Sequence, residues 1–145
     1  YNMRSQIFAK SLALPVVIGN LKRLEMLRDN PEHKKKLWDN VNKLQFGLKS
    51  NGFDIGVTNS CVTPVYMQGT TEEAMNLVYD LRENHGVFCS IVVYPVVPKG
   101  MMILRLIPTA THTDRDIADT LQAFKAISAK LKAGAYAKQF QHSVV

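Results

Sequence analysis

Apolar residues recur at helical spacing in two adjoining segments of the first third of the chain. From Pro15 to Arg28, and again after Pro31, they fall three or four residues apart, which places them on one face of an α-helix. Asn30 followed by Pro31 is a typical helix start, and Gly52 is a typical helix end. The pattern therefore predicts two helices that meet at Asn30 and Pro31. The second should bury Leu37, Val41, Leu44 and Leu48.

Short runs of β-branched and aliphatic residues follow, separated by further helical patterns. These runs predict strands within 59–68, 87–94 and 101–107. Thr70 and Thr113 are each followed three residues later by an acidic residue, which is typical of a helix N-cap. We expect helices to start there and to end near Gly86 and Leu131. The pattern weakens from Ala133, so the end of the chain is expected to fray.

The predicted order is helix, helix, strand, helix, strand, strand, helix. Because strands and helices do not alternate over a long stretch, this order indicates an α+β fold, with a small, three- to four-stranded, mainly antiparallel sheet and helices packed on one face. A length of 145 residues, 46% of them hydrophobic, suits one domain with its own core. We expect that domain at 29–133, after a linking segment and helix at 1–28 and before a tail at 134–145.

Composition narrows the class of protein. The chain carries 21% charged residues and many aliphatic ones, so it is expected to fold. Its net charge of +6 would favour a polyanion, but the dense run from Lys34 to Lys36 is typical of a solvated helix face. The chain opens at Tyr1 and is expected to be a piece of a longer protein. It shows no leader and no apolar stretch near the roughly 18 residues that span a bilayer, which predicts a cytoplasmic protein without a membrane span.

Few residues indicate chemistry of their own. The four histidines are scattered and, with Cys61 and Cys89, match no zinc pattern, so no metal is expected. The two cysteines form no C-x-x-C pair and are expected to be buried thiols. His112, next to the Thr113 cap, is expected to complete local hydrogen bonds. No nucleophile elbow, phosphate-binding glycine loop or zinc-protease motif occurs, so the sequence predicts no self-contained catalytic centre.

Arg105 is the exception, because it interrupts an apolar run that otherwise predicts a buried strand. Leu104 and Leu106 should face one side of the sheet and Arg105 the other. One interpretation is a solvent-exposed arginine on an edge strand. The other is a guanidinium presented to a ligand carboxylate, where its planar fork forms two charge-assisted hydrogen bonds of about 1.5 to 3 kcal/mol each when shielded from water. The pattern alone leaves both open.

A family resemblance favours the second interpretation. The stretch YPVVPKG, from Tyr94 to Gly100, followed by Arg105 and by ATHT at 110–113, resembles the C-terminal domain of the pyridoxal-phosphate enzymes of the α-oxoamine synthase family. This family includes 2-amino-3-ketobutyrate coenzyme A ligase (glycine C-acetyltransferase), 8-amino-7-oxononanoate synthase and serine palmitoyltransferase, and the stretch is most similar to the sequence of the first. Further similar segments cover nearly the whole chain, at 3–15, 22–27, 35–41, 52–56 and 63–67.

The resemblance implies a homodimeric acyltransferase that condenses an amino acid with an acyl-coenzyme A, with its active site at the subunit interface. Arg105 falls on the position that binds the carboxylate of the amino acid, which orients the substrate on the cofactor. Phe8 precedes the positions whose small polar side chains contact the cofactor phosphate in relatives. Here they are Ala9 and Lys10, so a hydroxyl is missing and the phosphate contact depends on the lysine, on Ser11 or on backbone N–H groups.

The resemblance also implies what the chain lacks. The family's Schiff-base lysine, its pyridinium-binding aspartate and its ring-stacking histidine belong to a large domain, which is the expected partner of this one. The chain alone is therefore expected to bind no pyridoxal phosphate and to be inactive. Two other classes remain open: a ferredoxin-like nucleic-acid-binding module, which the charge would suit but which lacks paired exposed aromatic residues, and a purely structural dimerisation domain.

Overall fold

The computed structural model describes residues 12–137 of the chain. Their contacts divide the chain into two units, with the boundary between Lys35 and Lys36. The described part of the first unit holds helix α2, Leu14–Asp29, in which no residue is buried, and the start of helix α3, Pro31–Ser50. Asn30 separates the two helices as predicted, and its side-chain amide donates a 2.7 Å hydrogen bond to the carbonyl of Met26. Helix α3 continues into the second unit.

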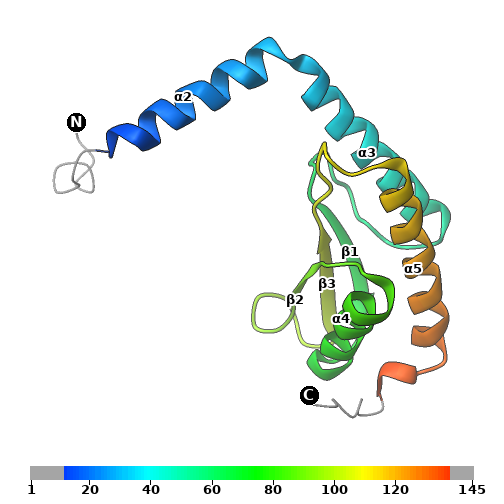
Figure 1. Ribbon diagram of the computed structural model, residues 1–145. Helices are drawn as coiled ribbons and strands as arrows, with labels where there is room; N and C mark the ends of the chain where they lie inside the picture. The colour runs from blue at the N-terminus through cyan, green and yellow to red at the C-terminus, as the bar shows by residue number, and fades with distance from the viewer. Residues whose placement is uncertain (1–11, 138–145) are drawn as a thin grey trace. The chain divides into compact units, whose positions relative to one another are not determined.

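The second unit contains a three-stranded antiparallel sheet, which confirms the predicted α+β fold (Figure 1). The strands are β1, Thr63–Gln68; β2, Ser90–Val92; and β3, Met101–Leu106, in the order β1-β3-β2. Helix α4, Thr71–His85, connects β1 to β2. Helix α5, Asp114–Lys132, follows β3, and a short 3-10 helix, η1, spans Ala135–Ala137.

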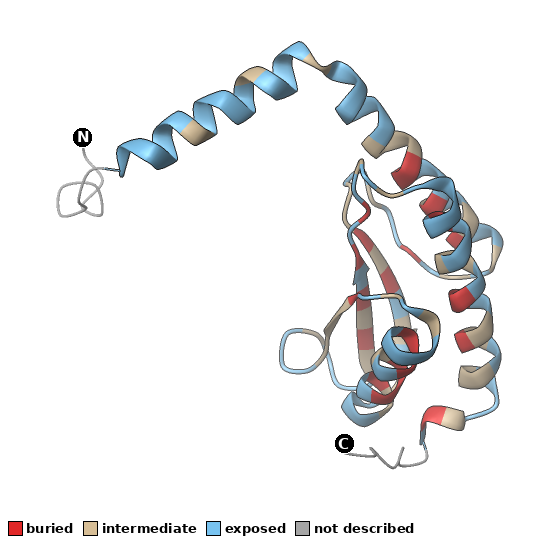
Figure 2. Ribbon diagram, in the orientation of Figure 1, coloured by how far each residue is buried: buried red, intermediate tan, exposed pale blue. Residues whose placement is uncertain are grey.

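One face of this sheet is covered by helices. Figure 2 shows the buried positions alternating along β1 and β3 and lining the helix sides that face them. The hydrophobic core joins side chains of three helices to one face of the sheet: Leu44, Leu48, Val65, Leu77, Leu81, Met102, Leu104, Phe124 and Ile127. Val41, Leu44 and Leu48 are buried as predicted, at 0 to 2% exposure. The prediction for Leu37 is wrong: it is only partly buried, because the side chains of α3 that join the core lie further along the helix. The approach of α3 to α5 is close, because a Cβ at Gly47 would collide with the side chain of Leu121.

The helix ends follow the predicted signals. Thr70 and Glu73 form a reciprocal capping box at the start of α4: the Thr70 hydroxyl accepts from the Glu73 N–H, and the Glu73 carboxylate accepts from the Thr70 N–H. Thr113 and Asp116 do the same for α5. Gly86 ends α4 with a φ of 66°, a left-handed conformation that glycine adopts without steric cost.

Two segments differ from the sequence prediction. Strand β2 covers three residues instead of the eight predicted at 87–94, because only those three pair with β3. The chain beyond Ala133, expected to fray, continues into η1, where Tyr136 is 1% exposed. An aromatic ring buried against α4 and α5 fixes this end of the chain, since removing the ring from water is favourable.

The Tyr136 hydroxyl completes a polar cluster under α4. The carboxylate of Asp80 is fully buried and accepts hydrogen bonds from the Tyr136 hydroxyl at 2.5 Å, from Lys130 Nζ at 2.7 and 2.9 Å and from the Asn84 amide at 2.7 Å. Burial raises the pKa of Asp80, but the hydrogen bonds outweigh burial and hold that pKa below its ordinary 3.8. Burial and the neighbouring carboxylate raise the pKa of Tyr136. The cluster ties α5 and η1 to α4.

Candidate functional site

Arg105 lies on the central strand of the sheet, on the face that the helices leave open. Its neighbours on the same strand, Leu104 and Leu106, are 0% and 4% exposed, whereas Arg105 is exposed. This alternation confirms the predicted orientation of the side chain. Because β3 lies between β1 and β2, the interpretation of an arginine on an edge strand is wrong. Arg105 is the penultimate residue of β3 and is paired with a strand on each side, which fixes its backbone geometry.

Among the described residues, the guanidinium of Arg105 has one polar contact. Its Nε donates a 3.1 Å hydrogen bond to the hydroxyl of Ser90, the residue directly across from it on β2. On the other side the partner of Arg105 in the register is Pro64, which offers no polar side-chain atom. No carboxylate of residues 12–137 lies within ion-pair distance of Arg105. The terminal Nη1 and Nη2 groups are therefore available to an anion.

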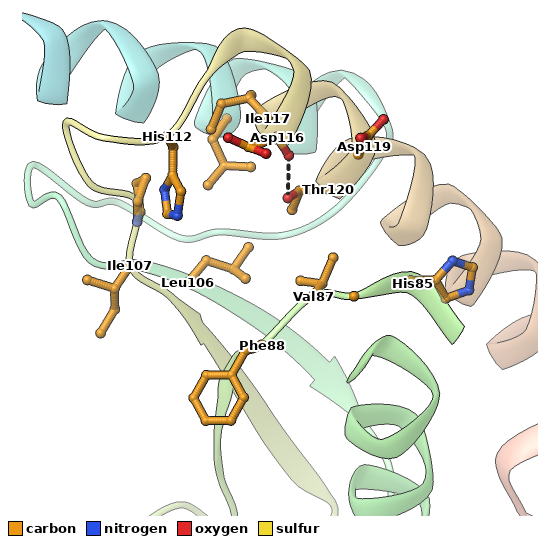
Figure 3. A pocket seen from close by; sticks show the side chains of 13 residues that line it. His85, Val87, Phe88, Leu106, Ile107, His112, Asp116, Ile117, Asp119 and Thr120 are labelled. Atoms are coloured by element: carbon orange, nitrogen blue, oxygen red, sulfur yellow. Dashed lines mark hydrogen bonds between the residues drawn. The ribbon is translucent and has the colours of Figure 1, made fainter. Parts of the chain in front are cut away.

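Apolar side chains surround Arg105 on the open face of the sheet, which we define by Tyr66, Phe88, Ile103, Arg105 and Ile107. Tyr66 and Ile103 are opposite each other in the register and lie on the same side as Arg105. Phe88 precedes β2 by two residues and extends the same row, and Figure 3 shows its ring and the Ile107 side chain pointing the same way, away from Leu106 and Val87. Tyr66, Ile107 and Phe88 are 37%, 58% and 81% exposed. A charged fork ringed by exposed apolar groups is typical of a binding surface.

A pocket of about 340 Å³ lies at the end of β3 (Figure 3). Leu106, Val87 and Ile117 give it apolar walls, and His85 and His112 also line it. Among the described residues, the Nε2 atom of His85 is buried without a hydrogen-bond partner. Phe88 and Ile107 of the open face line the same pocket, but Arg105 does not.

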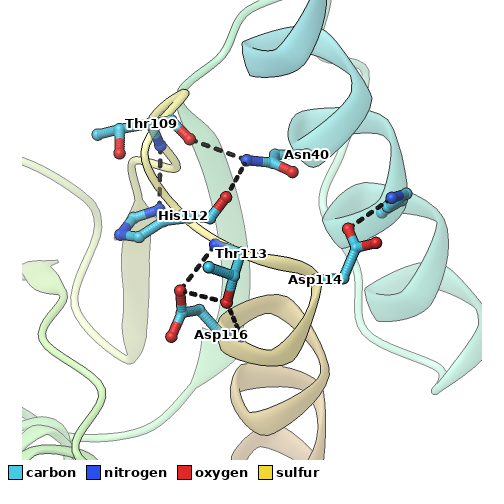
Figure 4. Close-up of polar contacts among 7 residues, drawn as sticks. Asn40, Thr109, His112, Thr113, Asp114 and Asp116 are labelled. Atoms are coloured by element: carbon cyan, nitrogen blue, oxygen red, sulfur yellow. Dashed lines mark hydrogen bonds and ion pairs between the residues drawn. The ribbon is translucent and has the colours of Figure 1, made fainter.

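The loop between β3 and α5 is fixed by a polar network, shown in Figure 4. The side-chain amide of Asn40, 3% exposed, donates 2.9 Å hydrogen bonds to the carbonyls of Thr109 and His112. His112 Nδ1 accepts from the Thr109 N–H at 3.0 Å, which confirms the predicted local role of this histidine. The hydrogen bonds that Thr113 donates lower the pKa of Asp116. The network fixes the loop that follows Arg105 and thus the end of its strand.

The histidine, cysteine and acidic side chains of the described residues form no metal site. In the described part of the chain, no three His, Cys, Asp or Glu side chains lie together as a metal would require. Cys61 and Cys89 are both free thiols. Cys89 is buried as predicted, and burial raises its pKa to about 11, so it is protonated near neutral pH. Cys61 is only partly buried. No helix within residues 12–137 is both long and apolar enough to cross a membrane.

The residues around the two pockets do not fit pyridoxal phosphate on their own. The pocket at the end of β3 has carboxylates, from Asp116 and Asp119, but no lysine. A second pocket, of about 260 Å³, has Lys99 beside the first residues of α4 but no carboxylate to face a pyridinium nitrogen. Ala9 and Lys10, the predicted phosphate contacts, lie outside the described residues. The described residues therefore show no complete set of groups for the cofactor.

Two of the residues that build this site were not predicted from the sequence. Ser90 was placed in a strand, but its pairing with Arg105 depends on the register of β2 against β3. Asn40 was not singled out either, although a polar residue next to Val41 on the buried face of α3 was a signal that its amide has a specific partner.

Comparison with known proteins shows which family this fold belongs to. No family model matches the chain. A cysteate-C-fatty acyltransferase of Capnocytophaga ochracea is 62% identical over 94% of the chain and 32% of the relative. An 8-amino-7-oxononanoate synthase of Thermoanaerobacter pseudethanolicus is 36% identical over 90% of the chain and 33% of the relative. A serine palmitoyltransferase structure with pyridoxal phosphate superposes with a TM-score of 0.79 at 29% identity, covering 92% of this chain and 33% of that one.

The chain is a segment of the pyridoxal-phosphate-dependent α-oxoamine synthase family. It spans about a third of the length of the curated relatives it matches and corresponds to the C-terminal part of the solved structures. The predicted family and fold are thus confirmed. The expected type within the family is a 2-amino-3-ketobutyrate coenzyme A ligase or 8-amino-7-oxononanoate synthase, with a serine palmitoyltransferase type as the alternative. The comparisons support the alternative better, because the relative that is 62% identical is a fatty acyltransferase, whereas the oxononanoate synthase is 36% identical.

Proposed function

We propose that this chain is the C-terminal domain of a pyridoxal-phosphate-dependent acyltransferase that joins an amino acid to a fatty acyl-coenzyme A. We further propose that Arg105 binds the carboxylate of the amino acid. The observation that carries the proposal is that the terminal Nη groups of Arg105, on the open face of the sheet, have no carboxylate partner among the described residues. An arginine in that state has two parallel N–H donors for a bidentate carboxylate.

The surroundings of Arg105 suit such a role once the open face is covered. Exposed Tyr66, Phe88 and Ile107 form an apolar ring that a larger part of the same polypeptide would bury, and the two thirds of the relatives' length outside this chain provides that part. Covering the ring would exclude water around the guanidinium. A charge-assisted hydrogen bond is stronger in that environment than on an open surface.

Cysteate is our proposed amino acid, because the cysteate-C-fatty acyltransferase is the more similar of the two curated relatives described above. The cofactor, when bound, would stabilise negative charge on the α-carbon of the amino acid. The part of Arg105 is different: it holds the carboxylate in one orientation, so that the bonds of the α-carbon are aligned for reaction. The partners of the domain would be its own large domain and a second subunit, and the protein would be cytoplasmic.

The intact, cofactor-loaded protein tests this proposal through steady-state kinetics with cysteate and palmitoyl-coenzyme A. We expect Arg105→Ala to raise the KM for cysteate about 100-fold, because two charge-assisted hydrogen bonds are lost, and to leave the KM for the acyl donor within about threefold. Arg115→Ala is the matched control: this arginine of α5 is 89% exposed and pairs with nearby Asp119. It should change neither constant more than about twofold.

The choice of amino acid is tested in the same assay. Cysteate, serine, glycine and alanine are compared as substrates at equal acyl donor concentration. We expect the largest kcat/KM with cysteate. A larger kcat/KM with serine would support the serine palmitoyltransferase type, and a KM for every amino acid that is unchanged in Arg105→Ala would disprove the role of the arginine.

A further inference from the structure

Ser90 is the one described residue that contacts the Arg105 side chain through a polar atom. Its hydroxyl accepts from Arg105 Nε at 3.1 Å, across the β2-β3 pair in which the two residues are direct partners. We propose that Ser90 is a positioning residue, which fixes the guanidinium so that the substrate carboxylate is bound end-on, by Nη1 and Nη2. The inference rests on the proposed function and adds a residue and a binding geometry to it.

The geometry follows from which donor is already in use. A carboxylate can meet a guanidinium side-on, through Nε and one Nη, or end-on, through both Nη groups. Ser90 occupies the Nε–H of Arg105, so the side-on arrangement would break an existing hydrogen bond. The end-on arrangement keeps that bond and adds two. The direction in which the fork points is then set by the β2-β3 register rather than by the substrate.

Only one side of the Arg105 guanidinium is restrained in this way. Pro64, its partner on β1, has no side-chain donor or acceptor, and the flanking residues of the open face are apolar. Without the Ser90 hydroxyl, the arginine would sample several rotamers and would lose that freedom on binding. A side chain that is already ordered loses less conformational entropy, which improves affinity for the ligand it faces.

The hydroxyl of Ser90 is neutral, which matters for a site that is to bind a carboxylate. An acidic side chain there would form an ion pair with Arg105 and would compete with the substrate for the same donors. Serine holds the guanidinium but leaves its charge uncompensated. Replacing Ser90 by aspartate should therefore mimic the loss of the arginine, although the arginine is still present.

The test is steady-state kinetics of the intact, cofactor-loaded protein with cysteate and palmitoyl-coenzyme A. We expect Ser90→Ala to raise the KM for cysteate about tenfold and to leave the KM for the acyl donor within about twofold, which a general loss of structure would not do. Ser90→Thr keeps the hydroxyl and should restore the KM to within about threefold of the original. Ser90→Asp should raise it about as far as Arg105→Ala. Ser50→Ala, the same change at an exposed residue ending α3, is the control and should have no effect.

A double-mutant cycle shows whether Ser90 acts through the arginine. Lysine at position 105 has no Nε–H fork, so Ser90→Ala in an Arg105→Lys background should change the KM for cysteate less than about twofold. A full tenfold effect in that background would overturn the inference, as would equal KM values for Ser90→Ala and Ser90→Thr. If Arg105→Ala changes the KM and Ser90→Ala does not, the positioning role alone is disproved. If Arg105→Ala changes nothing, the proposed function itself is disproved.

Discussion

The two faces of the sheet are made from the same three strands but have opposite environments. On the covered face, Val65, Met102 and Leu104 are 0% exposed and lie under helices α3, α4 and α5. On the open face, Tyr66 and Ile107 are 37% and 58% exposed and no helix of the second unit covers them. Apolar side chains occur on both faces, but the open face also holds Arg105 and Ser90, and only the covered face forms the core of this unit. Exposed apolar side chains grouped near a charged one are typical of a docking surface.

The charged residues on the two sides of the sheet, Asp80 and Arg105, also differ in their hydrogen-bond partners. Under α4, the Asp80 carboxylate has an ammonium, a hydroxyl and an amide as hydrogen-bond partners. On the open face, Arg105 has one neutral hydroxyl. A buried charge must be compensated within the protein, as Asp80 is. Arg105 is exposed, so water can solvate its charge, and its terminal Nη groups have no carboxylate partner among the described residues.

The largest effect on stability is expected from truncating a side chain of the covered face. Leu104→Ala removes a fully buried side chain from the core and should lower the free energy of unfolding by about 3 kcal/mol, the transfer and cavity cost of such a change. Ile103→Ala, the adjacent residue on the open face, is the control and should cost less than about 1 kcal/mol. Urea unfolding of the chain, followed by circular dichroism, measures both. Equal losses would mean that the open face is covered in solution by another copy of the chain.

The sequence predicted the elements better than the site, and the reason lies in the range of the interactions. The helices from Pro31, Thr71 and Asp114 were found because their starts and faces are local signals. The outward orientation of Arg105 was also predictable, because alternation along a strand is local. The shortness of β2 was not, since a strand ends where its partner stops pairing.

The contacts that define the site are non-local. The hydrogen bond between Ser90 and Arg105 joins residues 15 apart, and those of Asn40 reach Thr109 and His112, 69 and 72 residues away. Such contacts depend on the register and on the packing of α3, which no short window of sequence contains. The burial of Tyr136 was missed for the same reason: its partner, Asp80, is 56 residues earlier.

The next largest effect on the free energy of unfolding is expected from changing the buried carboxylate of Asp80. Asp80→Asn removes the negative charge that three groups share, and we expect it to lower the free energy of unfolding by about 2 kcal/mol at neutral pH. The loss is less than for a fully buried ion pair, because the Lys130 side chain is 41% exposed. Asp119→Asn, in an exposed pair with Arg115, is the matched control and should cost less than about 0.5 kcal/mol.

The difference in free energy of unfolding between the original chain and Asp80→Asn should depend on pH, because the pKa of Asp80 is lowered. A carboxyl with a lower pKa in the folded chain contributes stability above its unfolded pKa, and the contribution is lost as pH falls through the folded value. The difference between the original chain and Asp80→Asn should therefore be constant from pH 7 to about 5 and should shrink below the ordinary value of 3.8. A difference that grows on acidification would show that the pKa is raised instead. Urea unfolding at a series of pH values measures it.

The smallest effect on stability is expected on the open face, where the surface properties should change most. Phe88 is 81% exposed, so Phe88→Ser should alter the free energy of unfolding of the chain by less than about 0.5 kcal/mol. The same change should reduce binding of a hydrophobic dye, because Phe88 lies on the open face together with exposed Ile107 and Tyr66. Phe46, which is 75% exposed on α3 and apart from that patch, provides the control Phe46→Ser. Dye fluorescence and urea unfolding are measured on all three chains.

The two phenylalanines separate a docking surface from ordinary exposed apolar residues. If both substitutions lower dye binding equally, the open face is no different from the rest of the surface, and the comparison of the two faces loses its functional meaning. If only Phe88→Ser lowers it, the same variant in the intact protein should also lower the midpoint of thermal unfolding, because there the ring would lose a partner that the 145-residue chain does not have. A side chain that is dispensable in the chain and required in the intact protein is one whose burial is supplied by the rest of the polypeptide, against the face that presents Arg105.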